Sequence, residues 1–145
     1  MTLALDTDIL VNWLVRGTPF HRSARRLVET EVKRRGGTLG IAPQILHEFL
    51  HVATDPKRLE RPFSMAQAVA VSRELWDAKE VVRIMPAPAV LHRTLELLST
   101  LSLGRKRILD TALAATLEAA GIRRLATFNG DDFRIFPFLE VVEPA

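Results

Sequence analysis

The chain contains no cysteine, which excludes disulfide bonds, thiol nucleophiles and thiolate metal sites. It also lacks long apolar runs, because charged residues interrupt each one within about ten residues, whereas a membrane-spanning helix needs roughly 20. The opening residues MTLALDTDILV place an aspartate where a secretory signal would have its apolar centre. We therefore expect a protein without a membrane segment or an export signal, working in a reducing cytoplasm.

Glycine-rich phosphate loops are absent as well. The chain has neither a G-x-G-x-x-G motif nor a P-loop, and its isolated Gly36-Gly37 pair and Gly104 are typical of turns. No lysine stands in a suitable catalytic context either. These absences disfavour a flavodoxin-like signalling or nucleotide-binding domain, although such a domain would share the layout of strands and helices described below.

The composition is that of one globular domain. The 145 residues are 48% apolar and 26% charged, a balance that predicts a single domain over residues 1–145. Basic residues number 20 against 17 acidic ones, a net charge of +3. If several acids gather at one site, the remaining surface is basic enough to suit a nucleic-acid backbone; the alternative is an ordinary solvated, arginine-rich surface.

Short apolar segments alternate with amphipathic ones along the chain. Strands are expected at residues 3–6, 38–42, 81–85, 124–127 and 139–142, and helices at 8–15, 18–36, 43–52, 64–76, 90–101 and 108–120. The helix over 18–36 is expected to begin with Thr18 as its cap and Pro19 in its first turn. This alternation predicts an α/β fold in three layers, α/β/α, around a central parallel sheet of four to five strands.

Three acids occupy positions where an acid is not the easiest choice for stability. Asp6 ends an apolar strand and Asp110 lies in the first turn of an apolar helix, so each could simply cap a helix. Glu48 differs, because it shares a helix face with Ile45 and Val52. A buried carboxylate needs a partner, which here is either an arginine or a metal.

A fourth acid, Asp132, follows the fourth expected strand, next to an Asn129-Gly130 pair that could be only a turn. Sites in doubly wound sheets lie beyond the carboxyl ends of the strands, so the four acids should meet at one edge. Crowded carboxylates call for a hard cation such as Mg²⁺ or Mn²⁺, which can activate water for attack on phosphorus. The cluster therefore predicts metal-dependent phosphodiester hydrolysis.

A competing metal site is spelled by His47-Glu48-Phe49-Leu50-His51, which matches the H-E-x-x-H zinc-protease motif. The longer metzincin form would require Gly and His where the chain has Thr54 and Lys57. A zinc protease would also leave the other three acids without a purpose, which makes it the weaker hypothesis.

The basic run Arg105, Lys106 and Arg107 directly precedes Asp110. It is interpreted as a loop that positions phosphates beside the site, with a solvated loop or a non-catalytic RNA-binding module as alternatives. Among the aromatic residues, Phe20, Trp13 and Trp76 are candidates for stacking bases, although the apolar neighbours of both tryptophans favour core packing.

Four segments, in this order, resemble the PIN-domain family: LDTDI (5–9), HEFL (47–50), ILDTALAA (108–115) and ATFNGDDF (126–133). The loop TDPKRL (54–59), followed by PFS (62–64) and a helix, is similar to the VapC-type toxins within that family. The resemblance spans almost the whole chain. It implies a Mg²⁺- or Mn²⁺-dependent endoribonuclease that cuts single-stranded RNA or structured tRNA or rRNA loops, forms homodimers and is inhibited by a cognate antitoxin protein.

The resemblance also implies roles for individual residues. Asp6, Glu48 and Asp110 would bind the metal, with Asp132 as a more peripheral fourth acid. The supporting residues, which would hydrogen-bond to those carboxylates or to the attacking water, are Thr7, Thr111 and Thr127. One departure is that Asn129 stands where many relatives have an acid, so a second metal is expected to bind weakly or only with substrate, and the roles of Asn129, Asp131 and Asp132 stay open.

Overall fold

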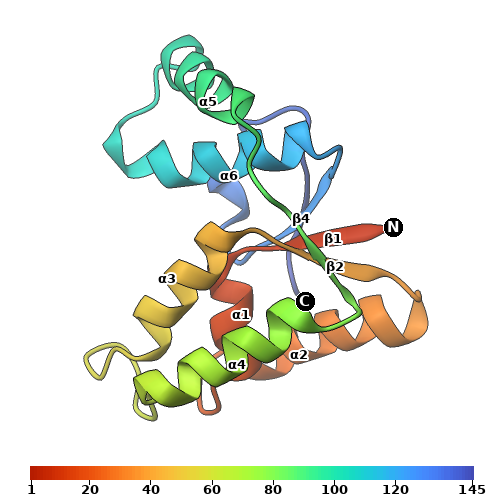
Figure 1. Ribbon diagram of the computed structural model, residues 1–145, viewed down its shortest axis with the longest axis vertical. Coiled ribbons are helices and arrows are strands. Elements are labelled where there is room, and N and C mark those ends of the chain that lie inside the picture. Colours follow the sequence, from red (N-terminus) through yellow and green to blue (C-terminus); the bar gives the residue numbers. More distant parts are fainter.

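Five parallel strands form the centre of the structure, a computed structural model that describes residues 1–145 (Figure 1). They are β1 (Thr2–Leu5), β2 (Thr38–Ile41), β3 (Val81–Arg83), β4 (Arg124–Ala126) and β5 (Glu140–Val142). Their order in the sheet is β3-β2-β1-β4-β5. The chain therefore starts with the central strand, β1. It adds β2 and β3 on one side of β1 and then β4 and β5 on the other.

Six α-helices cover the two faces of this sheet. They are α1 (Thr7–Leu14), α2 (His21–Glu29), α3 (Pro43–Ala53), α4 (Met65–Asp77), α5 (Ala89–Thr100) and α6 (Ile108–Ala119). Helices α1 to α4 lie on one side of the sheet, and α5 and α6 lie together on the other (Figure 1). This is the expected three-layer α/β/α fold with a five-stranded parallel sheet.

The central strands are apolar because helices cover them on both faces. Leu3 and Leu5 on β1 and Leu125 on β4 are at most 1% exposed. Most elements lie within two residues of the expected bounds, and Ser64 caps α4 through a reciprocal pair of hydrogen bonds with Gln67. None of the helices is both long enough and apolar enough to cross a membrane.

The helix expected over 18–36 differs from the prediction at both ends. Thr18 and Pro19 lie in a turn, and α2 begins at His21. The Thr18 hydroxyl donates back to the carbonyls of Asn12 and Val15, so it fastens the turn to α1 instead of capping α2. After Glu29 the helix continues as a π-helical segment, η1 (Thr30–Arg34).

A buried ion pair joins η1 to the sheet. Glu31 accepts two hydrogen bonds from the Arg124 guanidinium, at 2.9 and 3.0 Å, and only 5% of its side chain is exposed. Neutral Gly37 lies against this pair, because a Cβ there would stand 2.7 Å from Glu31 Oε2. The sequence offered no signal for the pair, since Glu31 lies in a strongly charged segment.

Candidate active site

The site lies at the carboxyl ends of β1 and β4, where the sheet order reverses on either side of β1. Asp6 directly follows β1, and its backbone N–H donates to the carbonyl of Ala126 at the end of β4. Thr127 then directly follows β4. The sheet itself therefore holds the two segments that carry these residues side by side.

Asp6 caps α1 and is tied to both segments. Its Oδ1 accepts from the backbone N–H of Thr7 at 2.8 Å, and its Oδ2 accepts from the hydroxyl of the fully buried Thr127 at 2.8 Å. Burial raises the pKa of Asp6, the two hydrogen bonds oppose that shift, and the charges of Glu48 and Asp132 add to it. Asp6 thus fulfils the capping role and also belongs to a cluster of carboxylates.

Glu48 reaches the same cluster from α3. Its Oε2 accepts from the Thr7 hydroxyl at 2.8 Å, and its Oε1 accepts from Gln44 Nε2 at 3.0 Å. The same Gln44 nitrogen donates to the carbonyl of Leu109, which connects α3 to the start of α6. No arginine pairs with Glu48, so the salt-bridge alternative that the sequence left open is not what the structure has.

Asp110 faces the cluster from the first turn of α6. Burial raises its pKa to about 6, and the charges of Asp6, Asp132 and Glu48 contribute, while Arg107 opposes them. Asp110 therefore lies within electrostatic reach of the other three acids that were expected to converge. Thr111 differs from the expectation, because its hydroxyl donates to the carbonyl of Arg107 at 2.7 Å and not to a carboxylate.

Asp132 lies in a 3-10 turn, η3 (Gly130–Asp132), and 45% of its side chain is exposed. Arg107 contacts it twice, donating to its carbonyl at 2.8 Å and lying 3.2 Å from its carboxylate. Asp131 instead pairs with Arg134 and has 97% of its side chain exposed. Of these two neighbouring acids, Asp132 is the one whose charge reaches Asp6 and Asp110.

Asp8 is a fifth acid at this edge, and the sequence reasoning missed it. Its Oδ2 accepts from the backbone N–H of Phe128 at 3.1 Å and from Asn129 Nδ2 at 2.9 Å, while its Oδ1 is buried without a hydrogen bond. Burial and the charge of Asp6 raise the pKa of Asp8 to about 7. The available signal was an acid two residues after Asp6, inside an otherwise apolar helix.

Only part of the basic run touches this cluster. Arg107 is engaged with Asp132, whereas Arg105 and Lys106, in the 3-10 turn η2 (Arg105–Arg107), are exposed and have no salt-bridge partner. The first two residues are therefore free to meet an external anion. Arg107 acts on the site itself.

The H-E-x-x-H motif does not form a site of its own. His47 and His51 are both exposed on α3, while Glu48 between them turns toward Thr7. A zinc-protease centre needs the two imidazoles to converge with a third ligand, and no such set is present. The match to the motif therefore does not indicate a zinc site, since only Glu48 belongs to the carboxylate cluster.

The donor chemistry of the cluster fits a hard divalent cation. Its members are carboxylates, and burial together with neighbouring negative charges raises the pKa values of Asp6, Asp8 and Asp110. Mg²⁺ and Mn²⁺ select oxygen ligands of this kind. As the side chains stand, no three of the acidic or histidine residues are arranged around a common metal position. A bound cation would offset both the burial and the mutual repulsion that raise the pKa values of Asp6, Asp8 and Asp110.

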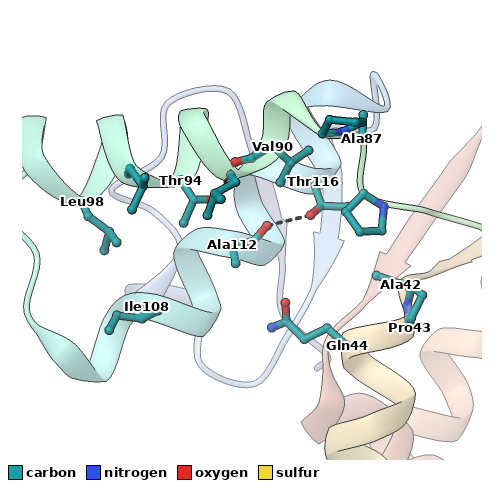
Figure 2. A pocket seen from close by; sticks show the side chains of 14 residues that line it. Ala42, Pro43, Gln44, Ala87, Val90, Thr94, Leu98, Ile108, Ala112 and Thr116 are labelled. Carbon is teal, nitrogen blue, oxygen red and sulfur yellow. Dashed lines mark hydrogen bonds between the residues drawn. The ribbon is translucent and has the colours of Figure 1, made fainter.

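An apolar groove of about 640 Å³ adjoins the site (Figure 2). It lies between α5, α6 and the start of α3, with Val90, Leu98 and Ile108 on its walls and Gln44 at the lower edge of the view. Gln44 also holds Glu48, so one residue borders both the groove and the carboxylate cluster. Leu91 and Leu95, which also line the groove, are 64% and 55% exposed.

Comparisons with known proteins identify the family. The family model for the PIN domain matches residues 3–139. Ribonuclease VapC24 of Mycobacterium tuberculosis is 27% identical over 142 residues, covering 98% of this chain and 96% of that protein.

Two solved structures have the same fold. The crystal structure of M. tuberculosis VapC20, described as a sarcin-ricin loop cleaving toxin, has a TM-score of 0.69 at 15% identity and covers 92% of this chain and 95% of its own. VapBC2 from Rickettsia felis, bound to a DNA fragment from its promoter, has a TM-score of 0.66 at 18% identity, with 100% of both chains covered. The match over residues 3–139, together with the acids grouped at the edge of the sheet, shows that this chain belongs to the PIN domain family.

Proposed function

We propose that the chain is a metal-dependent endoribonuclease, a single PIN nuclease domain over residues 1–145 that serves as the toxin of a toxin–antitoxin pair. Membership of the PIN family and the similarity to Ribonuclease VapC24 over 98% of the chain support this function. One observation carries this proposal. At one sheet edge, the charges of Glu48 and Asp132 raise the pKa of Asp6, and the charges of all three of these acids raise the pKa of Asp110.

The four acids are proposed as the metal-binding and catalytic residues, with Mg²⁺ or Mn²⁺ as the cofactor. When bound, such a cation supplies Lewis acidity and lowers the pKa of a coordinated water. Thr7 and Thr127 keep Glu48 and Asp6 oriented through their hydroxyl donors, which fixes the acids before substrate arrives. Asn129 acts one step further out, through Asp8.

RNA is proposed to approach over the start of α6. Arg105 and Lys106 are exposed next to Asp110 and would contact phosphates, which position a nucleic acid without reading its sequence. Arg107 is not proposed as a phosphate contact, because its guanidinium is already paired with the carboxylate of Asp132. The cytoplasm is the proposed site of action, because cellular RNA is found there.

A cognate antitoxin protein is the proposed inhibitor, and a homodimer is the proposed assembly. Toxin–antitoxin complexes among the similar structures support the first of these, including VapBC2 and a complex from Klebsiella pneumoniae with a TM-score of 0.63 at 20% identity. Light scattering of the purified chain, alone and with the protein encoded by the neighbouring reading frame, tests both.

The decisive experiment incubates the purified chain with labelled single-stranded RNA under Mg²⁺, Mn²⁺ or Zn²⁺, and in parallel with casein. We expect cleavage of RNA with Mg²⁺ or Mn²⁺, loss of cleavage in EDTA and no proteolysis. RNA that is bound but stays intact under every metal would replace the nuclease with a non-catalytic RNA-binding module.

A further inference from the structure

An exposed aromatic pair stands beside the carboxylates. Phe20, in the turn before α2, stacks on Phe128 with ring centroids 5.0 Å apart and ring planes 25° from parallel. Phe128 is partly buried and packs against the core, whereas 54% of Phe20 is exposed. One phenyl ring is thus supported from behind and open to solvent.

Hydrogen bonds around Asn12 hold this open ring in place. The backbone N–H of Phe20 donates to Asn12 Oδ1 at 3.1 Å, and the Asn12 carbonyl lies 2.8 Å from His21 Nδ1 and accepts from the Thr18 hydroxyl at 3.2 Å. Single exposed apolar side chains are ordinary on protein surfaces and need no explanation. A ring that is exposed, stacked and fastened through its own backbone is pre-organised for contact.

The pair sits on the rim of the proposed catalytic cluster. Phe128 directly follows Thr127, whose hydroxyl donates to Asp6, and its own N–H donates to Asp8. Consecutive Cα atoms lie only about 3.8 Å apart, so Phe128 begins one residue from Thr127, the hydrogen-bond partner of Asp6. The aromatic pair is thus attached to the segment that orients the site.

We propose that Phe20 and Phe128 form a stacking platform for an unpaired base of the RNA substrate, next to the bond that is cut. This inference rests on the proposed ribonuclease function and deepens it. In a duplex both faces of each base are already stacked on neighbouring bases, so only an unpaired base has a face available for Phe20. Base stacking on aromatic side chains is a general mode of single-strand binding. Arg16 and Arg22, both exposed and within four residues of Phe20, offer charge for the flanking phosphates.

The test measures binding and stacking separately from cleavage. In an Asp6→Asn background, single-stranded RNA oligonucleotides carry the fluorescent base 2-aminopurine at one position at a time, and quenching reports stacking. We expect one strongly quenched position, and Phe20→Ala and Phe20→Leu should each abolish that quenching and weaken binding about tenfold. Phe20→Trp should retain both, since the indole also stacks.

Met65→Ala is the matched control, because Met65 is 58% exposed on α4 and has no aromatic partner. Wild-type affinity and quenching in Phe20→Leu would overturn the platform, since leucine keeps the apolar volume and removes the flat ring. Normal RNA binding with lost antitoxin binding in Phe20→Ala would overturn it in favour of a protein contact. If the wild-type chain cleaves no RNA, the proposed function fails; if it cleaves RNA and the Phe20 variants match it, only the platform fails.

Discussion

Asn129 donates from its side-chain amide to Asp8 Oδ2 at 2.9 Å, across 121 residues of chain. The same oxygen accepts from the backbone N–H of Phe128, so Asp8 fixes the segment after β4. Thr127 lies at the start of this segment and donates to Asp6. Asp8, which was not among the predicted site residues, therefore helps to orient Asp6 through Thr127.

Asp8→Asn should lower RNA cleavage at least about tenfold with little loss of stability. The amide oxygen can replace Oδ2 as the acceptor, but its NH2 group would then take the buried position of Oδ1, where no partner is present, and the carboxylate charge is lost from the site. In the free energy of unfolding, removal of a charge that is unfavourable through burial and the repulsion of Asp6 offsets the unpaired amide N–H. Initial cleavage rates and thermal melting of both proteins measure the two effects.

Asp131→Asn is the control for this change, because Asp131 is exposed and pairs only with Arg134. It should cleave like the wild type. Equal rates for Asp8→Asn and Asp131→Asn would show that the contact with Asn129 has no bearing on the site.

Asp6→Asn and Asp110→Asn should each reduce cleavage by about a thousandfold or more while the fold survives. Each amide keeps the shape of the acid and removes a charge that a divalent cation requires. For Asp110, whose pKa burial raises to about 6, the substitution also removes a charge that is unfavourable in the metal-free fold. Circular dichroism and single-turnover cleavage test the pair; EDTA-resistant cleavage in either variant would contradict a metal role.

The metal-free protein should lose stability as the pH rises from about 4 to about 7. Asp8 and Asp110 have folded-state pKa values of about 7 and about 6 against an ordinary value of 3.8, so the folded state binds more protons than the unfolded state in this window. Each group contributes a slope of at most about 1.4 kcal/mol per pH unit.

Urea unfolding in EDTA, at about one-unit pH intervals across this window, measures the slope. The slope should flatten in Asp8→Asn and shrink when Mg²⁺ is added, because the cation favours the ionised carboxylates. A flat profile in the metal-free wild type would mean that the pKa values of Asp8 and Asp110 are not raised in the folded state.

Glu31→Gln should destabilise the fold by about 3 kcal/mol, because it leaves the Arg124 charge buried without a counter-charge. Arg124 depends on this partner, which raises its pKa, and the pKa of Glu31 is lowered in return. Exposed Glu29→Gln is the matched control and should leave stability almost unchanged, because its ion pair with Arg25 lies in solvent. Urea denaturation compares the two variants, and similar midpoints would show that the buried pair contributes nothing.

The alternation of apolar and amphipathic segments was enough to predict the layers and the parallel sheet. Each strand here is short and covered on both faces, so its apolar character is unbroken and easily recognised. The expectation that the acids after β1 and β4, on α3 and on α6 approach one edge followed from the same layout. The helix expected over 108–120 is α6, and Gly121 directly after it has a positive φ of 71°, which is typical of a helix end.

What the sequence did not reveal were partnerships between side chains far apart along the chain. The Thr18-Pro19 pair has the composition of a helix start, but tertiary hydrogen bonds to α1 decide its conformation. Asp8 resembled an ordinary first-turn acid, and only the approach of Phe128 and Asn129 distinguishes it. Sequence periodicity indicates which face of a helix or strand is buried. It carries no information about which distant hydrogen-bond donor contacts a side chain on that face.

The pairing of β1 with β4 makes the site depend on two distant parts of the chain. Asp6 and its partner Thr127 are separated by 121 residues, so the hydrogen bond between them forms only when both strands are in place in the sheet. A fragment that lacks β4 would therefore retain Asp6 without the hydroxyl that orients it.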